Sequence, residues 1–594
     1  MKLIENKISS ARKNFVFSVV IFLFLILFVR MYNLQIMQYS KYVGIANSNR
    51  IRMIPTEAPR GIIYDRNGQI VADNKFQYNI NVIPFEFDPD GESCEKVAGL
   101  LDITPGTIKK RMRNNWRGRF LPAKIAEDVD IETLTKIQEH KLELPGVLYT
   151  FEPLRSFPSA ANMSHIIGYL REVSQKDIEL SRDFNYQQGD LIGWKGIERQ
   201  YEKILRGKRG IKYIQVNAWG QAVGTYKGEE EIPAQPGKDL SLTIELGLQK
   251  LAEDLMAELP GVVILMNPEN GEIYAMVSSP DYSPNLFSGI ISPEDWAVLR
   301  DNPARPLYNR ITNGLYPPGS TLKMVAAIAA LENNIISSNH EFFCSGKYRL
   351  GRRVFHCWNE YGHGRVDMEK AIEQSCNVYF YNLIRKMDID LWAKYASLFG
   401  FGRKTGIDLP NEHPGVCPDS EYLNAKYGVN KWTEGNKLNQ VIGQGDMIAT
   451  PVQLAKYVSI LSTRGKVVRP HLALKYKNMK GEGFTYLRPE QKQIAGISEH
   501  NWRFIQEAMS RVVYAPRGTG SRARVDSMRV FGKTGTSQNP HGEDHAWFVG
   551  WAENDSIKVA AAAVIEHGGH GGSAAAPIIQ QLFEYCKNNV EKFK

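Results

Sequence analysis

An uninterrupted apolar run from Phe15 to Val29 constrains this chain more than any other feature. At about 1.5 Å per residue the run is shorter than a hydrocarbon core of about 30 Å, so a span needs the weaker extension past Arg30 to Met37. A cleaved signal peptide is the rival interpretation, but no small-residue cleavage site follows the run. No second run reaches the length of about 18 apolar residues that a span needs. We therefore expect one uncleaved transmembrane helix over residues 15–37.

The charges before this run predict its orientation. Four basic residues precede it, namely Lys2, Lys7, Arg12 and Lys13. The positive-inside rule places such residues in the cytoplasm. We expect a cytoplasmic tail at 1–14 and a large body on the outer side of the cytoplasmic (inner) membrane.

Composition bounds what that body is. The chain has 594 residues, of which 43% are hydrophobic and 23% charged, which is typical of globular domains and excludes a disordered, collagen-like or coiled-coil chain. The net charge of +9 is scattered, without a dense basic run or a nucleic-acid motif, so we expect no nucleic-acid partner. Six cysteines are too few for a disulfide scaffold but sufficient for one metal site.

The order of sequence patterns predicts an α+β organisation. Residues 51–82 alternate like strands around a turn at Asn67-Gly68, and residues 90–145 have a helical, charged pattern. The stretch EEEIPAQPGKDLS indicates a domain boundary. Beyond it come a hairpin around Asn270-Gly271, a helical middle, three consecutive strands and a last helix over 577–590. Strands at both ends of one region predict a sheet that remote segments complete.

Three short motifs carry the candidate chemistry. Ser320 and Lys323 form S-x-x-K at the start of an apolar helix, so their side chains share one face. A serine hydroxyl is a weak nucleophile without a base, and lysine becomes that base only when its pKa falls. The helix dipole and a second cation, Lys533 of K-T-G, both lower that pKa. Ser375 and Asn377 of S-x-N are expected to point into the same cleft.

The order of these motifs is more informative than any one of them. Alone, S-x-x-K arises by chance, and most serines near a helix start cap the helix. Together, S-x-x-K, S-x-N and K-T-G are the set of penicillin-recognising serine enzymes. The chain resembles the class B penicillin-binding proteins, most closely their elongation type, penicillin-binding protein 2. The phrases that carry this resemblance are RGIIYDRNG, HIIGY, GWKGIERQYEKILRG, YPPGSTLKM, GHGR, GQGDMIATPVQ and KTGTSQ.

The resemblance implies a fold. It implies an α+β multidomain protein with one N-terminal transmembrane helix and a mixed β-rich and helical pedestal that resembles a dimerisation domain. A C-terminal penicillin-binding transpeptidase domain follows, with an antiparallel sheet flanked by helices. With the boundary above, we expect the pedestal at 38–235 and the transpeptidase domain at 236–594.

The resemblance also implies a reaction, the D,D-transpeptidation that cross-links peptidoglycan stem peptides during cell elongation. Ser320 would attack the D-Ala-D-Ala carbonyl and release D-alanine, while Lys323 takes the serine proton. Ser375 and Asn377 would relay protons and hold the acyl chain. The residues expected to bind the substrate carboxylate are Lys533, Thr534, Gly535 and Thr536.

Further parts of this mechanism and its partners follow from the same resemblance. The oxyanion would lie between the backbone N–H groups of Ser320 and Thr536. β-Lactams would acylate Ser320, and no organic cofactor is implied. Because no glycosyltransferase phrase is present, glycan polymerisation would come from a SEDS-family, RodA-type polymerase, with an MreC-type scaffold as regulator.

A group of cysteines and histidines surrounds the S-x-N motif. Cys344, Cys357, Cys376 and His363 supply three thiols and an imidazole, the ligand set of a tetrahedral structural Zn²⁺. Their spacing is not that of a zinc knuckle, and His356 competes with His363 as the nitrogen ligand. A Cys344–Cys357 disulfide or buried free thiols remain alternatives. If Ser375 and Asn377 face the cleft, Cys376 between them faces away from it.

Four other functions are weighed from sequence alone. A D,D-carboxypeptidase or a β-lactamase would share the motifs, although neither needs a pedestal on a signal-anchor. A β-lactam sensor or a catalytically dispensable scaffold that activates the polymerase belongs to a different class. His541 and His545 follow K-T-G, but the lysines make a histidine base redundant, so we interpret both as loop or strand-end residues.

Overall fold

The computed structural model describes residues 10–42, 51–116, 118–119, 121–181, 186–216, 222–225, 231–289, 291–429, 431–478, 483–539 and 542–594. The chain divides into two compact units. The first comprises Met1–Ala58, Gln77–Glu152 and Lys208–Gln235. The second comprises Pro59–Phe76, Pro153–Gly207 and Pro236–Lys594. Each unit is therefore assembled from segments that are not contiguous in sequence.

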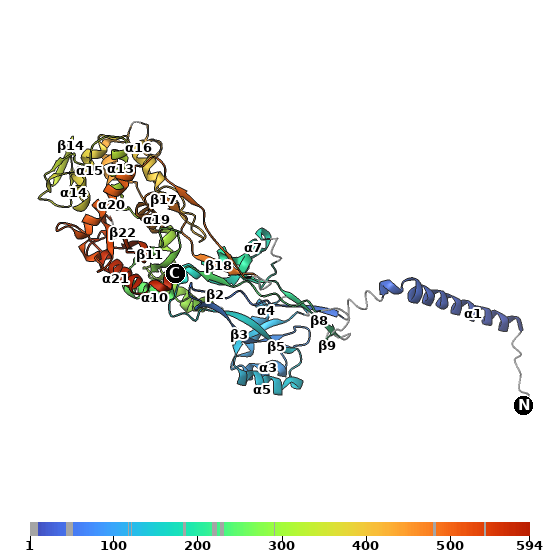
Figure 1. Ribbon diagram of the computed structural model, residues 1–594. Coiled ribbons are helices and arrows are strands. Elements are labelled where there is room, and N and C mark those ends of the chain that lie inside the picture. Colours follow the sequence, from blue (N-terminus) through green and yellow to red (C-terminus); the bar gives the residue numbers. More distant parts are fainter. Residues whose placement is uncertain are drawn as a thin grey trace, which may run out of the picture. The chain divides into compact units, whose positions relative to one another are not determined.

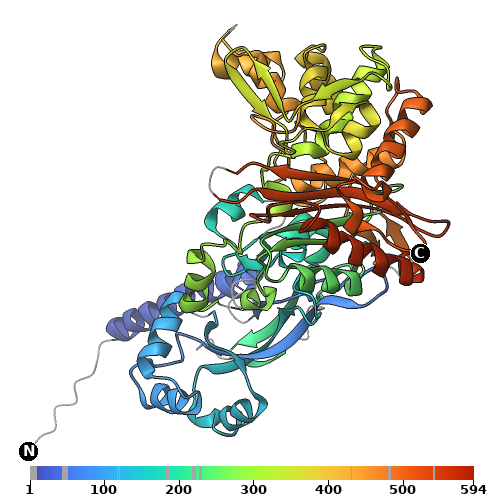
Figure 2. The ribbon, with the colours of Figure 1, turned by 90° about the vertical axis from the view of Figure 1, so that its left-hand side faces the viewer.

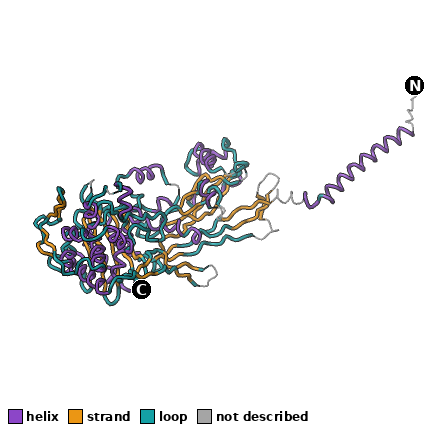
Figure 3. The backbone as a smooth tube through the Cα atoms, turned by 90° about the horizontal axis from the view of Figure 1, so that it is seen from above, coloured by secondary structure: helices purple, strands orange, loops and turns teal. Residues whose placement is uncertain are grey.

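The apolar run forms a helix, as expected. Helix α1 (Ser10–Tyr32) continues as a π-helical turn to Met37, and Figure 3 shows it as one continuous coil. Its 28 residues, at about 1.5 Å each, exceed the thickness of about 30 Å that a hydrocarbon core requires. None of its side chains is buried against the protein. Its length, composition and exposed apolar side chains fit a single-pass membrane anchor.

The first unit contains a small antiparallel sheet and a helical layer. The sheet has the order β1-β8-β9. The helices pack on strands β3 and β4, and their apolar side chains share one core with those strands. The elements are β1 (Ile51–Thr56), the second half of β3 (Ile70–Val82), α3 (Glu92–Leu100), α4 (Pro105–Asn114), β4 (Ala123–Val129), α5 (Ile131–Glu139), the first part of β5 (Val147–Ser156), β8 (Gly210–Val216) and β9 (Ala222–Thr225).

Strand β4 corrects the expectation that residues 90–145 are helical throughout. Helices α3, α4 and α5 form there, but β4 separates α4 from α5. Its residues Ala123, Ile125 and Ala126 are buried beside β3, and a charged stretch follows them. Only a few apolar residues mark this strand, which is too short a pattern to be recognised against the surrounding charges.

The second unit is built around a five-stranded antiparallel sheet of order β12-β11-β23-β22-β21. The hairpin β11 (Gly261–Met266) and β12 (Ile273–Ser279) turns at Asn270-Gly271, as predicted. The three strands near the C-terminus are β21 (Arg529–Ser537), β22 (His545–Glu553) and β23 (Lys558–Ile565). Strand β23 pairs with β11, so remote segments complete the sheet. Figure 2 shows these C-terminal strands running side by side.

Helices cover both faces of this sheet, which explains why its central strands β11 and β23 are apolar along nearly their whole length. Helices α10 (Leu246–Met256) and α21 (Ala575–Asn588) cover one face, and α19 and α20 lie on the other, with α13 packed on α20 (Figure 1). In β11, Val263 and Leu265 pack in the core under α10 and α21. Val262 and Ile264 point the other way and pack in the core under α19 and α20. A strand buried on both sides has no polar face, so it reads as a continuous apolar run.

Further elements surround the sheet. The helices are α6 (Ser164–Ile167), α7 (Gln175–Leu180), α8 (Gly196–Gln200), α9 (Glu202–Leu205), α11 (Pro293–Asp301), α12 (Arg310–Asn313), α13 (Lys323–Glu332), α14 (Met368–Glu373), α15 (Asn377–Ile384), α16 (Ile389–Leu398), α17 (Ser420–Tyr427), α18 (Glu434–Val441), α19 (Pro451–Ser462) and α20 (Glu499–Tyr514). The short strands are β2 (Ile63–Tyr64), β6 (Leu170–Glu172), β7 (Leu191–Gly193), β10 (Leu240–Leu242), β13 (Phe342–Cys344), β14 (Lys347–Leu350), β15 (Arg353–His356), β16 (Gly364–Val366), β17 (Lys466–Val468), β18 (Ala473–Lys477), β19 (Phe484–Tyr486) and β20 (Gln491–Gln493).

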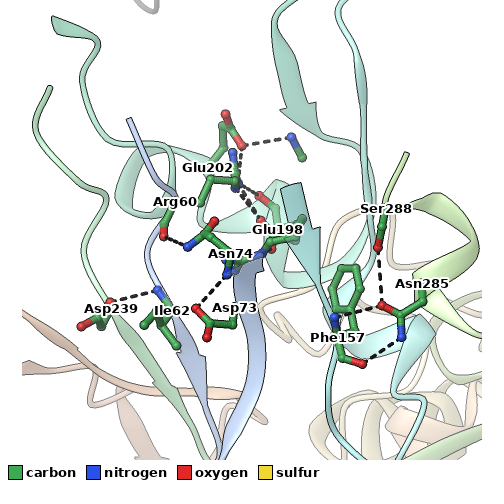
Figure 4. Close-up of polar contacts among 12 residues, drawn as sticks. Arg60, Ile62, Asp73, Asn74, Phe157, Glu198, Glu202, Asp239, Asn285 and Ser288 are labelled. Atoms are coloured by element: carbon green, nitrogen blue, oxygen red, sulfur yellow. Dashed lines mark hydrogen bonds and ion pairs between the residues drawn. The ribbon is translucent and has the colours of Figure 1, made fainter. Parts of the chain in front are cut away.

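A buried ionic cluster joins the early segments of the second unit (Figure 4). Arg60 Nη2 lies 2.6 Å from Glu198 Oε2 and 2.8 Å from Glu202 Oε2. Arg155 Nε lies 2.7 Å from Glu198 Oε1. Asn74 Nδ2 donates to the carbonyl of Arg60 at 2.7 Å. Burial alone would raise the pKa of Glu198, but the two guanidinium groups hold it below its ordinary value. Glu198 therefore stays ionised although its side chain is fully buried.

Candidate active site

The predicted nucleophile lies in a tight turn beside the sheet. Ser320 belongs to a 3₁₀ turn, Gly319–Leu322, and α13 begins at Lys323, three residues later than expected. No side chain caps α13, so the alternative that Ser320 is a helix cap is wrong. Gly319 has a φ of +59°, and a Cβ there would lie 3.0 Å from the carbonyl oxygen of Thr536. Only glycine allows both this conformation and this approach.

Backbone contacts fix the segment that leads to Ser320. The carbonyl of Pro317 accepts hydrogen bonds from Ser537 Oγ and, at 3.1 Å, from Trp547 Nε1. The N–H of Gly319 donates to the carbonyl of Gly443 at 2.9 Å. Strands β21 and β22 and the loop at Gly443 therefore hold the turn that presents Ser320.

Lys323 lies fully buried behind this turn. Its Nζ donates to Asn377 Oδ1 at 2.7 Å, to the carbonyl of Ser375 at 2.8 Å and to Ser375 Oγ at 3.3 Å. These contacts use all three donors of an ammonium group. Burial lowers the pKa of Lys323 to about 8, against the opposing effect of nearby cysteine thiols. Burial, which no sequence pattern indicated, is thus the largest cause of the shift.

Ser375 is held in a strained conformation by the end of α14. Its φ is +56°, in the left-handed region that favours glycine. Its N–H donates to the carbonyl of Ile372 at 3.2 Å, and the N–H of Cys376 donates to that of Ala371 at 2.9 Å. This pair of bonds is the Schellman motif, in which the residue after the helix usually is glycine. A serine in this place aims its hydroxyl at the lysines.

Lys533 reaches the same hydroxyl from strand β21. Its Nζ lies 2.9 Å from Ser375 Oγ and 3.0 Å from the carbonyl of Thr534, and its side chain is fully buried. Burial, and then the charge of Lys323, lower its pKa well below the ordinary value. Two ammonium groups on one hydroxyl repel each other, which favours the loss of a proton from one of the lysines. The Ser375 hydroxyl can then pass a proton between them.

Strand β21 presents an open edge to this site. It is the last strand of the sheet, and β22 pairs with only one of its edges. The carbonyls of Thr534 and Thr536 accept from the side chains of Lys533 and, at 3.3 Å, of Gln444, and so face the other edge. In an antiparallel ladder the N–H and C=O of one residue point to the same side. The N–H of Thr536 therefore faces the turn of Ser320.

The glycine of K-T-G is required by packing. A Cβ at Gly535 would lie 3.0 Å from both Thr321 Cγ2 and Trp547 Cβ. This lets β21 approach the turn of Ser320 closely. On the other face of the strand, Thr534 Oγ1 lies 2.6 Å from Thr519 Oγ1.

The four predicted metal ligands meet in one cluster. One ligand atom from each of Cys344, Cys357, His363 and Cys376 lies within 4.8 Å of the others. His363 Nδ1 is 3.5 Å from Cys344 Sγ and 3.6 Å from Cys357 Sγ. Zinc bonds of about 2.3 Å to sulfur and about 2.0 Å to nitrogen, at a tetrahedral angle, put these atoms about 3.5 Å apart. The donor set and its spacing therefore fit a tetrahedral zinc ion.

The cluster decides two alternatives left open by sequence. All six cysteines are free, so a Cys344–Cys357 disulfide is wrong. His356 ends β15 with an exposed side chain, and only its carbonyl takes part, accepting from Asn377 Nδ2 at 3.4 Å. The N–H of Asn377 donates to Cys357 Sγ at 3.4 Å. The cluster thus lies directly behind the S-x-N motif.

Some residues that shape the site were not singled out from sequence. Gln444 lies within the phrase GQGD and contacts Thr536, and Thr519 follows a glycine-rich loop and contacts Thr534. Only the resemblance of the GQGD phrase could have indicated the first. His545 begins β22, where its Nδ1 accepts from the N–H of His567 at 3.2 Å. His541 lies outside the described residues.

The arrangement matches known proteins along nearly the whole chain. A family model for the penicillin-binding protein transpeptidase domain matches residues 261–584, and one for the penicillin-binding protein dimerisation domain matches residues 55–242. The peptidoglycan D,D-transpeptidase MrdA of Haemophilus influenzae is 33% identical over 99% of this chain and 94% of its own. The chain is a penicillin-binding protein of the MrdA family.

Solved structures of the same family share its fold. The penicillin-binding protein 2 of Helicobacter pylori, in complex with MreC, superposes with a TM-score of 0.79 at 28% identity, covering 91% of this chain and 99% of its own. The Pseudomonas aeruginosa penicillin-binding protein 2, in complex with WCK 5153, gives 0.68 at 30% identity, with 90% and 96% covered. This penicillin-binding protein is a serine-type peptidoglycan D,D-transpeptidase of the elongation type, and the fold class expected from sequence is confirmed.

Proposed function

We propose that Ser320 is the nucleophile of this D,D-transpeptidase and that the chain Lys323–Ser375–Lys533 moves its protons. The observation that carries the proposal is the Ser375 hydroxyl, which lies 3.3 Å and 2.9 Å from two buried lysine nitrogens directly behind the turn of Ser320. A neutral lysine is a competent base, and burial favours the neutral form.

Acylation then proceeds with a balanced set of proton transfers. Ser320 Oγ attacks the carbonyl carbon of the penultimate D-alanine, and its proton passes to Lys323. The backbone N–H groups of Ser320 and Thr536 stabilise the resulting oxyanion. When the C–N bond breaks, the leaving D-alanine amine takes a proton delivered through Ser375.

Deacylation reverses the same route. The amine of a neighbouring stem attacks the acyl carbon, and its proton returns through Ser375 to the lysines. Ser320 recovers its own proton as the ester bond breaks, and the new peptide bond is the cross-link. Asn377 holds the acyl chain and Lys323 in place.

The terminal carboxylate of the donor binds next to β21 in this proposal. The lysine pair retains one positive charge, which attracts the carboxylate. The backbone of Gly535 and the hydroxyls of Thr534 and Thr536 complete its hydrogen bonds. β-Lactams bind in the same way and acylate Ser320.

Orientation and domain limits are part of the same proposal. The basic residues before α1 keep residues 1–14 in the cytoplasm, residues 15–37 cross the membrane, and the catalytic part acts outside it. The pedestal extends over 38–235 and the transpeptidase domain over 236–594. An MreC-type scaffold, as in the Helicobacter pylori complex, and a RodA-type polymerase are the proposed partners.

Zinc is the proposed ion of the Cys344, Cys357, His363 and Cys376 cluster. Held there, it would supply a cross-link between the β13–β16 segment and the S-x-N motif, with no role in the proton transfers. Replacing Cys344 by serine should remove bound zinc from the native mass spectrum and lower the melting temperature. Cys417→Ser is the matched control, because Cys417 lies outside the cluster. Equal zinc content in both variants would exclude this site.

Intact mass spectrometry tests the nucleophile. The full-length protein in detergent should gain the mass of one benzylpenicillin, and Ser320→Ala should gain none while retaining its melting temperature. An adduct on the alanine variant would refute the assignment of Ser320. No adduct on either protein would favour a non-catalytic scaffold.

A further inference from the structure

A hairpin rich in positive charge belongs to the catalytic segment of the second unit and has no part in the mechanism above. Strands β14 and β15 pair with each other along their whole length. No acidic residue occurs in the sequence between Glu341 and Glu360, which flank the hairpin. Four exposed cations lie on the two strands and their turn, and we call this element the basic hairpin: Lys347, Arg349, Arg352 and Arg353.

One face of the basic hairpin is held by helix α15, beside which β14 lies in Figure 1. Tyr348 and Phe355 lie across from each other, and their ring centroids are 5.9 Å and 5.7 Å from that of Tyr381 in α15. Side chains alternate between the two faces of a strand, so Lys347 and Arg349 point away from this packed face. Their neighbours across the hairpin are a histidine and a valine, neither of which is negative. The outer face is therefore an exposed cationic surface on a fixed support.

The charges of the basic hairpin are not balanced by the protein itself. Within the described part of the chain, no carboxylate forms an ion pair with any of its four cations. Glu341 pairs instead with Arg365, at 3.9 Å. Like charges that share a strand face repel each other, so this arrangement does not stabilise the fold. A surface of this kind is complementary to an anionic partner.

The basic hairpin ends directly at the S-x-N motif. The carbonyl of His356, the last residue of β15, accepts from Asn377 Nδ2 at 3.4 Å and from Tyr381 Oη at 3.3 Å. Asn377 in turn contacts Lys323. In the proposed function the donor stem lies along β21, which leaves the side of the S-x-N motif to the strand that brings the attacking amine. The hairpin is thus next to the path of the second substrate.

Two exposed aromatic residues follow the hairpin. Trp358 is 56% exposed, although its Nε1 donates to the carbonyl of Gln374 at 2.9 Å, and Tyr361 is 97% exposed. Aromatic residues and arginine are the residue types that are enriched at interfaces. The surface beside the S-x-N motif therefore has the composition of a binding surface as well as its charge.

We propose that the basic hairpin binds the carboxylates of the peptidoglycan strand that supplies the acceptor amine. This inference rests on the proposed function, which makes such a strand the second substrate. Each stem that has not yet reacted as a donor ends in the free carboxylate of its terminal D-alanine. A strand with many stems therefore presents a row of negative charges, and several weak ion pairs along it act together. The hairpin positions the strand and does not touch the reacting atoms.

Soluble, uncross-linked peptidoglycan strands are the probe that tests this proposal. Benzylpenicillin first acylates the full-length protein in detergent, which blocks the donor site, and the dissociation constant for the strands is then measured by microscale thermophoresis. Lys347→Gln combined with Arg349→Gln should weaken binding about three- to tenfold, the loss of two exposed ion pairs, and leave the rate constant of benzylpenicillin acylation unchanged. Strands whose carboxylates are converted to amides should bind the wild type as weakly as native strands bind this variant.

A matched control and a reversal of charge complete the test. Arg403→Gln combined with Lys404→Gln removes the same two kinds of exposed cation outside the hairpin and should leave strand binding unchanged. Lys347→Glu combined with Arg349→Glu should weaken binding further than neutralisation does. High salt should reduce the difference between these variants and the wild type, because it screens exposed charges.

Three results would overturn the inference while the proposed function stands. They are unchanged strand binding by the neutralised hairpin, equal binding of amidated and native strands, and an equal loss of binding in the control variant. If the hairpin substitutions weaken only the binding to vesicles of anionic lipids, the partner is a membrane surface and the inference is likewise wrong. If benzylpenicillin does not acylate the wild type, the proposed function itself fails, and the inference fails with it.

Discussion

Two substitutions at Ser375 separate the strain of its backbone from the chemistry of its hydroxyl. Ser375→Ala and Ser375→Gly both remove the Oγ that lies between Lys323 and Lys533. Only alanine keeps a Cβ in the left-handed conformation, since φ is +56°. Both variants should lose acylation to the same extent, about 10²- to 10⁴-fold, as expected for the loss of a proton relay.

Glycine usually makes a folded protein less stable than alanine does, but at position 375 the order of the two variants should be reversed. A residue with a Cβ costs roughly 1–2 kcal/mol in the left-handed region, and glycine returns roughly 0.5–1 kcal/mol of this through its freer unfolded chain. Ser375→Gly should therefore be more stable than Ser375→Ala by about 1 kcal/mol, or about 2 °C in melting temperature for a domain of this size.

Differential scanning fluorimetry and benzylpenicillin acylation measure the two quantities on the same samples. The comparison between the variants cancels the loss of the hydroxyl, because both lack it. Equal melting temperatures would mean that the turn relaxes and that no strain is held at this position. Acylation that survives in either variant would remove Ser375 from the proton route.

Three further outcomes follow from buried charges and close packing. Because the pKa of Lys323 is lowered to about 8, the acylation rate constant should rise about tenfold from pH 7 to pH 9 and then level off. The variant Lys323→Arg should be inactive at every pH. A rate constant that does not change with pH in stopped-flow measurements would exclude Lys323 as the base. Glu198→Gln should cost about 3–5 kcal/mol in urea unfolding, since it leaves Arg155 and Arg60 without their shared carboxylate. The pKa of Glu198 is lowered in the folded protein, so its contribution to stability is present above the unfolded pKa of about 4.3 and is lost as the pH falls through the lower folded value. If the free energy of unfolding of the variant falls with acid pH just as that of the wild type does, this argument is wrong. Gly535→Ala should slow acylation by at least about tenfold, because the added methyl pushes β21 away from the turn of Ser320. A misplacement of about 1 Å in an active site lowers a rate by at least this factor. An unaltered acylation rate would refute the packing argument.

Sequence patterns predicted the parts of this fold that depend on local signals. The hairpin at Asn270-Gly271 and strand β23 carry nearly continuous apolar runs, because both faces of their sheet are covered. Strand β4 carries few apolar residues and lies between helices, so it was missed. Pairings between remote segments, such as β11 with β23, were expected in kind but not strand by strand.

The candidate site likewise has parts that sequence motifs predict and parts that they do not. Ser320, Lys323, Ser375 and Lys533 belong to motifs whose residue types the chemistry requires, and the structure brings the last three into direct contact. The burial that lowers the pKa of both lysines has no local signal, because it comes from packing between segments that are distant in sequence. The same holds for the left-handed Ser375, which occupies a position where helices usually place glycine.

The pairing of β11 with β23 sets an order on how the catalytic half of the chain can form. A ribosome makes β11 and β12 early, yet β11 lacks a neighbour on one side until the strands near the C-terminus have emerged. Lys533 lies on one of those late strands, so its contact with Ser375 can form only after nearly the whole chain has been synthesised. Until then the hairpin exposes an unpaired apolar edge, which is a site for aggregation during synthesis. Because of this topology, the active site can form only at the end of chain synthesis.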